Sequence, residues 1–263
     1  MKPQLNINNS FPKKSLGQNF IQNKDFIFKL SSLIRSDNNT NIFEIGPGMG
    51  ALTDQLIKKK FKNLYLIEKD FLLFHKLEDR FKKNKNVFVF NNDAIDYNYE
   101  VINNNQKSLI VGNLPFNISS QLLINWIVGY NWPPFYSKMI LMFQKEVANR
   151  IIAKHNQKSY SRISVITQAR CEIKVLLNAP SSIFFPKPKV DGTILEFTPI
   201  TKYLEIDISN LQKLLRKSFE HRRKKIKTSL KDYDYLLKRF GIDDGLRAEN
   251  LSVDDYCKLA SAI

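Results

Sequence analysis

The chain has 263 residues, of which 43% are hydrophobic, enough for one sizeable domain with a core and a small appendage. Its 41 Lys and Arg outnumber its 25 Asp and Glu, which leaves a formal net charge of +16. Such an excess creates a positive potential that attracts polyanions, with nucleic acid as the first candidate and an anionic membrane surface as the second. A biased genome composition would also give a Lys-rich and Asn-rich chain.

Cysteine usage and hydropathy exclude several classes of protein. Cys171 and Cys257 lie far apart, without a CxxC or Cys/His cluster, so we expect neither a disulfide framework nor a metal site. The first residues, MKPQLNINNSFPKKSLG, contain no apolar stretch typical of a signal peptide. No apolar run is long enough to span a bilayer. We therefore expect a soluble, cytoplasmic protein that does not bind membranes.

Helical and strand patterns alternate from about residue 23 to residue 200. The first helix has Asn23 as its expected N-cap and places Phe26, Leu30, Leu33 and Ile34 on one face. The other expected elements are a strand 41–45, a helix 51–59, a strand 63–68, a helix 70–83, strands 86–90 and 108–112, a helix 118–128, a strand 138–143, a helix 144–153 and a strand 190–197. Repeated β-α units with nearly continuous apolar strands predict an α/β fold with a mostly parallel sheet, to which 190–197 adds an antiparallel edge.

The pattern changes after about residue 200. Segments 207–231, 233–240 and 252–262 all have helical spacing without strand signals between them. Ser252 and Asp255 resemble a capping pair at the start of the last helix. We therefore predict two domains, an α/β domain over residues 1–200 and a small, basic, all-α domain over residues 201–263.

The segment FEIGPGMGAL (43–52) follows an expected strand and opens an expected helix. Glycines there remove Cβ atoms that would block a ligand, and a helix N-terminus presents free N–H groups. Gly46, Gly48 and Ala51 also satisfy the dinucleotide pattern GxGxx(G/A), so a nicotinamide enzyme remains an alternative.

Three carboxylates lie at or near the carboxyl ends of successive strands: Glu44, Glu68 and Asp93. Glu68 is placed to accept hydrogen bonds from ribose hydroxyls, and Asp93 to accept one from an adenine amine. Carboxylates favour a cofactor with cationic and hydroxyl groups over one with a pyrophosphate. The pattern therefore indicates S-adenosylmethionine and a Rossmann-like methyltransferase domain.

The most specific motif is GNLPFNIS (112–119), directly after the fourth strand. The amide oxygen of Asn113 and the carbonyl of Leu114 can both accept from an exocyclic amine, which directs the nitrogen lone pair toward a methyl group. Pro115 constrains the backbone there, and Phe116 offers a stacking face for a base. These four residues are the expected catalytic residues, and the chemistry requires no metal.

Together these motifs resemble the ribosomal RNA adenine N6,N6-dimethyltransferases of the small subunit, the KsgA type. The resemblance rests on KKSLGQNFI (13–21), EIGPGMGALT (44–53), IEKD (67–70), NDAID (92–96), GNLPFNIS, MFQKEVANRI (142–151), YSRISVITQ (160–168), FFPKPKVDG (184–192) and SFEHRRKKIKTSL (218–230). One departure is Phe116, where the small-subunit enzymes usually carry Tyr.

The resemblance implies residue roles and a substrate. The cofactor contacts would be Asn19, Ile21, Gly46, Glu68, Asp93 and Asn113. Phe184 would be the aromatic residue packed opposite the target base, and so a catalytic residue. The substrate would be two adjacent adenines in a hairpin loop near the 3′ end of 16S rRNA, each receiving two methyl groups. The partner would be an assembling small ribosomal subunit, with a role in ribosome biogenesis, and we expect the enzyme to be monomeric.

The basic segment HRRKKIK (221–227) belongs to the helix expected over 207–231. Leu211, Leu215, Phe219, Ile226 and Leu230 would share the face of that helix that packs on the protein. The cations cannot all follow that face inward, and we expect them to bind RNA phosphates: Arg222, Arg223, Lys224, Lys225 and Lys227. A solvated face and a membrane-surface helix are the alternatives.

Other functions fit part of the sequence. The same fold could act on a large-subunit rRNA adenine, although FFPKPKVDG and HRRKKIK favour the small-subunit group. A DNA adenine methyltransferase would need a target-recognition segment, for which the chain has no room. A non-catalytic RNA-binding assembly factor would not need Glu68, Asp93 and the NLPF motif. A nicotinamide enzyme leaves NLPF without a purpose.

Overall fold

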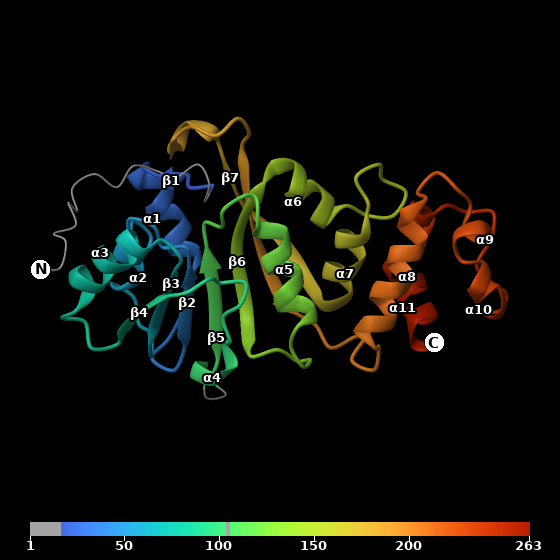
Figure 1. Ribbon diagram of the computed structural model, residues 1–263, viewed down its shortest axis with the longest axis horizontal. Helices are drawn as coiled ribbons and strands as arrows, with labels where there is room; N and C mark the ends of the chain where they lie inside the picture. The colour runs from blue at the N-terminus through green and yellow to red at the C-terminus, as the bar shows by residue number, and fades with distance from the viewer. Residues whose placement is uncertain (1–16, 104–105) are drawn as a thin grey trace, which may run out of the picture. The chain divides into compact units, whose positions relative to one another are not determined.

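The computed structural model describes residues 17–103 and 106–263 (Figure 1). It contains a seven-stranded sheet with the order β4-β3-β2-β5-β6-β9-β7 and a two-stranded sheet of β1 and β8. The strands are β1 Phe20–Ile21, β2 Asn41–Ile45, β3 Leu64–Glu68, β4 Val87–Asn91, β5 Ser108–Gly112, β6 Tyr136–Gln144, β7 Cys171–Ala179, β8 Phe184–Phe185 and β9 Gly192–Pro199. The predicted α/β fold with a mostly parallel sheet is confirmed.

Five adjacent strands of the large sheet pair in parallel. Their registers align Ile42 with Leu64, Leu64 with Val87, and Ile42 with Leu109. All residues of β2, β3 and β5 are buried. A strand buried on both faces is apolar nearly throughout, which is why these strands are recognisable from sequence. The carboxyl ends of β4, β3, β2 and β5 consequently meet at one edge.

Polar caps set the starts of the helices in this part. The side chain of Asn23 accepts a hydrogen bond from the Phe26 amide at 2.8 Å, and Asp70 accepts one from Leu72 at 2.9 Å. Such caps satisfy amides that have no partner inside the helix. The helices are α1 Lys24–Leu33, α2 Thr53–Leu56, α3 Phe71–Phe81, α4 Glu100–Asn103, α5 Ser119–Val128, α6 Lys145–Ile152, α7 Arg162–Arg170, α8 Ile208–Glu220, α9 Ile226–Ser229, α10 Asp234–Arg239 and α11 Val253–Ser261, with short 3-10 turns η2 Ser181–Ile183, η3 Lys231–Tyr233 and η4 Ala248–Asn250.

Two strand expectations differ from the structure. The late strand β9 is not an edge, because it lies between β6 and β7 in the sheet order. The edge is β7, which the sequence analysis did not identify because polar and charged residues interrupt its apolar pattern. The small sheet was also missed, since two-residue strands have no periodicity to detect. It pairs Phe20 with Phe185 and Ile21 with Phe184.

The chain divides into two compact units, which differ from the domains 1–200 and 201–263 expected from sequence. The first contains residues up to 122 together with 135–145 and 174–196, and the second contains 123–134, 146–173 and 197–263. The expected boundary followed the change from alternating elements to helices. In the structure, α7 packs on α8 and α11, so it belongs with the C-terminal helices. Their shared core includes Val165, Leu211, Leu215, Tyr256 and Leu259.

The helix expected over 207–231 is wrong, because the chain forms two helices there. Helix α8 ends at Glu220, and α9 begins at Ile226. A continuous helix would place Arg222, seven residues after Leu215, on the face that buries Leu215. The break keeps this cation away from the core and still allows Ile226 to be fully buried. The last helix starts as predicted, with Ser252 and Asp255 forming a capping box.

The described residues also bear on membranes and metals. None of their helices is both long and apolar enough to cross a bilayer. Within the same ranges, no group of three or more His, Cys, Asp or Glu side chains is arranged to hold a metal ion.

Candidate active site

A cleft opens at the edge where β2, β3, β4 and β5 end. It is lined by residues from five segments, within 17–20, 45–48, 67–73, 92–94 and 113–118. Four of these segments follow adjacent parallel strands, so the topology alone brings them together. The fifth is the N-terminal segment, of which the structure describes residues from Gly17 onward. The Lys13–Leu16 part of the KKSLGQNFI motif lies outside the described residues.

The glycine loop after β2 forms one wall of the cleft. Gly46, Gly48 and Gly50 have φ angles of +62°, +59° and +77°, a region that disfavours side chains. A Cβ atom on Gly48 would lie 2.7 Å from a ring carbon of Phe20. Glycine is therefore required both by the backbone and by the close approach of this ring. Phe20 lines the cleft, and the sequence analysis missed it although it lies between Asn19 and Ile21.

Glu68 lies at the end of β3 and its side chain holds two turns. Its Oε2 accepts a hydrogen bond from the Gly48 amide at 3.0 Å, and its Oε1 accepts one from the Asp70 amide at 2.9 Å. Burial raises the pKa of this carboxyl above its ordinary value, although the two backbone amides oppose the shift. Each oxygen retains capacity for another donor, such as a ribose hydroxyl. The Gly48 amide, which a pyrophosphate would need, is already used.

Asp93 follows β4, the strand next to β3, at the same edge of the sheet. Its Oδ2 accepts from the Lys69 ammonium at 2.6 Å, and its Oδ1 accepts from the Ile95 amide at 3.0 Å. Burial acts to raise the pKa of Asp93, but the hydrogen bonds and the Lys69 charge outweigh it and hold the pKa below its ordinary value. Lys69 was not expected at the site. Its position directly after Glu68 is the feature of the sequence that could have predicted it.

Glu44 does not line this cleft with Glu68 and Asp93. It adjoins a smaller neighbouring cavity, and its Oε2 accepts a hydrogen bond from the Thr53 hydroxyl at 2.7 Å. Its side chain is nearly inaccessible, and burial raises its pKa to about 8. The expectation of three carboxylates around one ligand is therefore corrected to two.

The NLPF motif follows β5, and its polar atoms are oriented by a long-range contact. The side-chain amide nitrogen of Asn113 donates to the backbone carbonyl of Asn19 at 2.9 Å. That bond fixes the Asn113 Nδ2 toward Asn19, so the other terminal atom of the amide is the oxygen Oδ1, an acceptor. Within the described part of the chain, no hydrogen bond uses the Asn113 Oδ1 or the Leu114 carbonyl. Both are thus available to accept from a ligand amine.

Of the residues expected at the site, Ile21 and Phe184 are buried in the protein core. Phe116 and Pro115 line the cleft as predicted. The Phe184 side chain is 4% exposed and packs in the core with Ile21, and neither lines the cleft. Adjacent residues of a strand point to opposite faces, so the Ile21–Phe184 pair faces the core when Phe20 faces the cleft. Phe116 packs against the core cluster that contains Phe184, and the pairing of the two rings around a base stays a prediction.

The basic segment 221–227 lies in the second unit, in the turn between α8 and α9 and in the first two residues of α9. Arg223, Lys224, Lys225 and Lys227 are exposed. Arg222 is partly buried, and its Nε donates to the Glu249 carboxylate at 2.6 Å. The structure thus gives Arg222 an internal partner, whereas the other four cations point to solvent.

Comparisons with known proteins identify the family to which a chain with this cleft belongs. The family model described as ribosomal RNA adenine dimethylase matches residues 9–263. This chain belongs to the ribosomal RNA adenine dimethylase family. A ribosomal RNA small subunit methyltransferase A of Pelagibacter ubique is 38% identical over 252 residues, which cover 94% of this chain and 95% of the relative. That of Blochmanniella floridana is 38% identical over 258 residues, covering 95% and 93%.

Solved structures show the same fold for this dimethylase. A dimethyladenosine transferase from Plasmodium falciparum has a TM-score of 0.79 at 24% identity, covering 91% of this chain and 95% of that one. The 23S rRNA methyltransferase ErmE has a TM-score of 0.69 at 20% identity, covering 91% and 97%. With its family established, the chain is an rRNA adenine dimethyltransferase, an enzyme of the class that depends on S-adenosylmethionine. The alternatives of a nicotinamide enzyme and of a non-catalytic RNA-binding assembly factor are thereby excluded.

Glu44 generates a prediction about the stability of the dimethylase. Burial raises the pKa of its native carboxyl to about 8, whereas the unfolded carboxyl has the ordinary glutamate pKa of 4.5. The stability from this proton is fully present below the unfolded pKa and is lost as the pH rises through the native pKa. In the wild type, the free energy of unfolding should fall between about pH 5 and about pH 9 by on the order of 4 kcal/mol.

Urea unfolding at both pH values tests this on Glu44→Gln, with the exposed Glu205→Gln as control. The Glu44 variant should lose most of the pH dependence, and the Glu205 variant should keep it. A pH dependence equal in the Glu44 variant and the wild type would contradict the raised pKa.

Proposed function

We propose that the protein transfers methyl groups from S-adenosylmethionine to the N6 amines of two adjacent adenines near the 3′ end of 16S rRNA. Each adenine would receive two methyl groups, in a hairpin loop of an assembling small subunit, as a step of ribosome biogenesis. The observation that carries this proposal is the orientation of Asn113, with its amide oxygen and the Leu114 carbonyl available at the cleft. The small-subunit substrate is supported by the two relatives, each a ribosomal RNA small subunit methyltransferase A.

The residues of the cleft fit S-adenosylmethionine. Glu68 offers two carboxylate oxygens to the ribose hydroxyls, and Asp93 offers an acceptor to the adenine amine. Gly46 leaves open space where a side chain would intrude, since only one atom lies within 4 Å of a Cβ built there. When bound, S-adenosylmethionine supplies a methyl group already activated by its sulfonium. Asn19 and Asn113 complete the set of proposed contacts in the cleft, whereas Ile21 would contribute only through its backbone.

The protein groups prepare the adenine amine as nucleophile. The Asn113 Oδ1 and the Leu114 carbonyl accept its two hydrogens, which turns the nitrogen lone pair out of conjugation with the ring. Phe116 offers a stacking face that offsets part of the cost of taking the base out of its stack. Pro115 fixes the backbone between the two acceptors. No general base with a strongly shifted pKa is needed, because the sulfonium is already an activated methyl donor. The methylated nitrogen then loses its extra proton to solvent.

Replacing Asn113 tests the proposed function. Asn113→Ala removes an acceptor aimed at the reacting nitrogen, so kcat should fall on the order of 10²–10³-fold. The assay is single-turnover methylation of small ribosomal subunits that lack these methyl groups. Asn149→Ala, on the exposed side of α6, is the matched control and should behave as wild type. Normal single-turnover methylation by Asn113→Ala would show that the motif is structural.

Glu68 provides a separate test of the methyl donor. Glu68→Gln keeps the side-chain shape but loses the charge that strengthens hydrogen bonds from ribose hydroxyls. Affinity for S-adenosylmethionine, measured by isothermal titration calorimetry, should fall roughly 10- to 100-fold. The exposed Glu205→Gln should not change it. Binding to small subunits should stay near wild type for both, and unchanged cofactor affinity in Glu68→Gln would contradict the assignment.

The exposed cations of 221–227 are proposed to bind rRNA phosphates. Each phosphate contact releases counterions, so its loss flattens the dependence of log K on log[salt]. Replacing both Lys224 and Lys225 with Gln should flatten the slope by ~1.4–1.8 units if both touch phosphate. The control replaces Lys83 and Lys85, two exposed lysines of the first unit, with Gln. Equal slopes for both double variants, measured on small subunits, would place 224–225 away from the RNA.

A further inference from the structure

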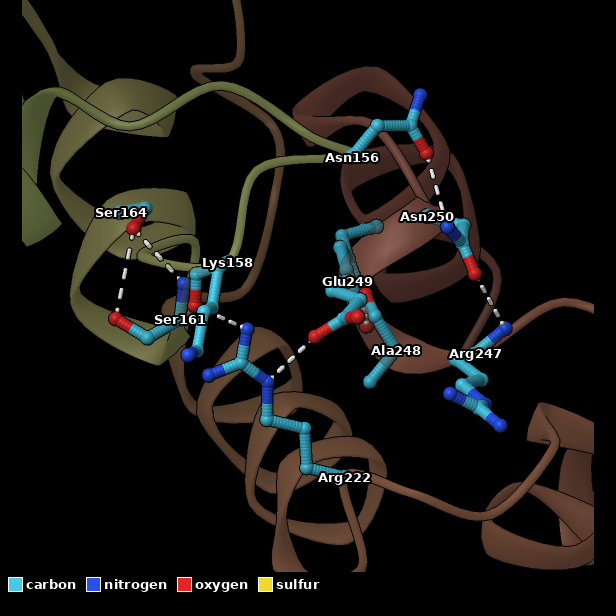
Figure 2. Close-up of polar contacts among 10 residues, drawn as sticks. Asn156, Lys158, Ser161, Ser164, Arg222, Arg247, Ala248, Glu249 and Asn250 are labelled. Carbon is cyan, nitrogen blue, oxygen red and sulfur yellow. Dashed lines mark hydrogen bonds and ion pairs between the residues drawn. The ribbon is translucent and has the colours of Figure 1, made fainter.

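Arg222 occupies a junction of three chain segments in the second unit (Figure 2). Its Nε donates to the Glu249 carboxylate at 2.6 Å, and its Nη2 donates to the backbone carbonyl of Lys158. Figure 2 shows its guanidinium between the loop that carries Lys158 and the turn that carries Glu249. One side chain thus joins the turn after α8, the loop after α6 and the turn η4.

The two partner segments are also bound directly to each other. The Asn156 amide donates to the Glu249 carbonyl at 2.8 Å, and the Asn250 side chain donates to the Asn156 side chain at 2.9 Å. Asn156 has a φ of +69°, a conformation that side chains rarely adopt. These bonds hold the loop in a conformation that it would not favour by itself. The Arg222 contacts add the turn 221–225 to the same arrangement.

All three segments of this junction carry exposed cations. They are Lys154 and Lys158 in the loop, Arg223, Lys224 and Lys225 in the turn, and Arg247 next to η4. Among the described residues, none of these six makes an ion pair, and their charges are available to phosphates. We call them the junction cations. Arg222 differs from them, because its charge is already opposed by Glu249.

We propose that Arg222 is a positioning residue that fixes the junction cations for RNA, and that it does not itself bind phosphate. This inference rests on the proposed rRNA-binding function. The guanidinium fork donates in two directions at once, to a carboxylate and to a carbonyl, which a lysine ammonium cannot reproduce with the same geometry. Ordering the segments before binding removes an entropic cost that the complex otherwise bears.

Substitutions of opposite charge separate positioning from phosphate binding. Arg222→Gln removes a positive charge, and Glu249→Gln removes a negative one. If Arg222 binds phosphate, the first should weaken RNA binding, and the second should strengthen it by releasing the guanidinium. If Arg222 positions the junction cations, both should weaken binding, and the double variant should be no weaker than the weaker single variant.

The experiment measures binding of full-length protein to small ribosomal subunits across a salt series. Each variant should weaken binding roughly 2- to 12-fold, the cost of ordering one more flexible side chain or segment. The slope of log K against log[salt] should stay as in the wild type, because the same phosphates are contacted once the segments are ordered. Arg223→Gln is the matched control next in the chain and should flatten the slope by ~0.7–0.9 units.

Two further measurements distinguish positioning by Arg222 from phosphate binding. Arg222→Lys retains the charge, so it should resemble Arg222→Gln under the positioning proposal and the wild type under phosphate binding. Hydrogen exchange should show faster exchange of the Asn156 amide in Arg222→Gln and Glu249→Gln while the α8 core amides remain protected. Tighter binding by Glu249→Gln, or a flattened slope in Arg222→Gln, would overturn the inference. Failure of the wild type itself to bind small subunits would instead overturn the proposed function.

Discussion

The buried carboxylate of Glu68 is the contact on which the geometry of the cleft depends. It accepts one amide from the glycine loop after β2 and another from the turn before α3. Asp70 in that turn caps α3 and accepts a hydrogen bond from the Gln18 side chain at 3.2 Å. Burying a carboxylate is costly, and here two backbone donors offset part of that cost. The same group therefore holds two loops and presents oxygens to the cleft.

A second long-range bond connects this frame to the reacting end of the site. Asn113 and Asn19 are joined although they are 94 residues apart, because β1 and β8 hold the N-terminal segment beside the cleft. The bond uses one N–H of the Asn113 amide and leaves its oxygen as an acceptor. Orientation is thus set by the fold before any substrate is present, which is the property that preorganised sites require.

Much of the fold and part of the site could be predicted from the sequence. Fully buried strands such as β2 (Asn41–Ile45) leave a nearly continuous apolar signal, and the groups after them meet because parallel strands align their ends. The direction in which side chains of the site motifs point was harder to predict. Glu44 and Phe184 belong to motifs of the site, yet alternation along the strand turns their side chains into the interior. The break after α8 was missed because apolar spacing continues through Ile226, and only the cost of burying Arg222 shows that the helix must end.

The most direct test of the account is to map the methylated bases. The protein would be incubated with labelled S-adenosylmethionine and with separate small and large ribosomal subunits that lack these methyl groups, and the rRNA analysed by mass spectrometry. The account predicts dimethyladenine at two adjacent positions near the 3′ end of 16S rRNA, with the large subunit unlabelled. Label confined to large-subunit adenines, or absent from both subunits, would contradict it.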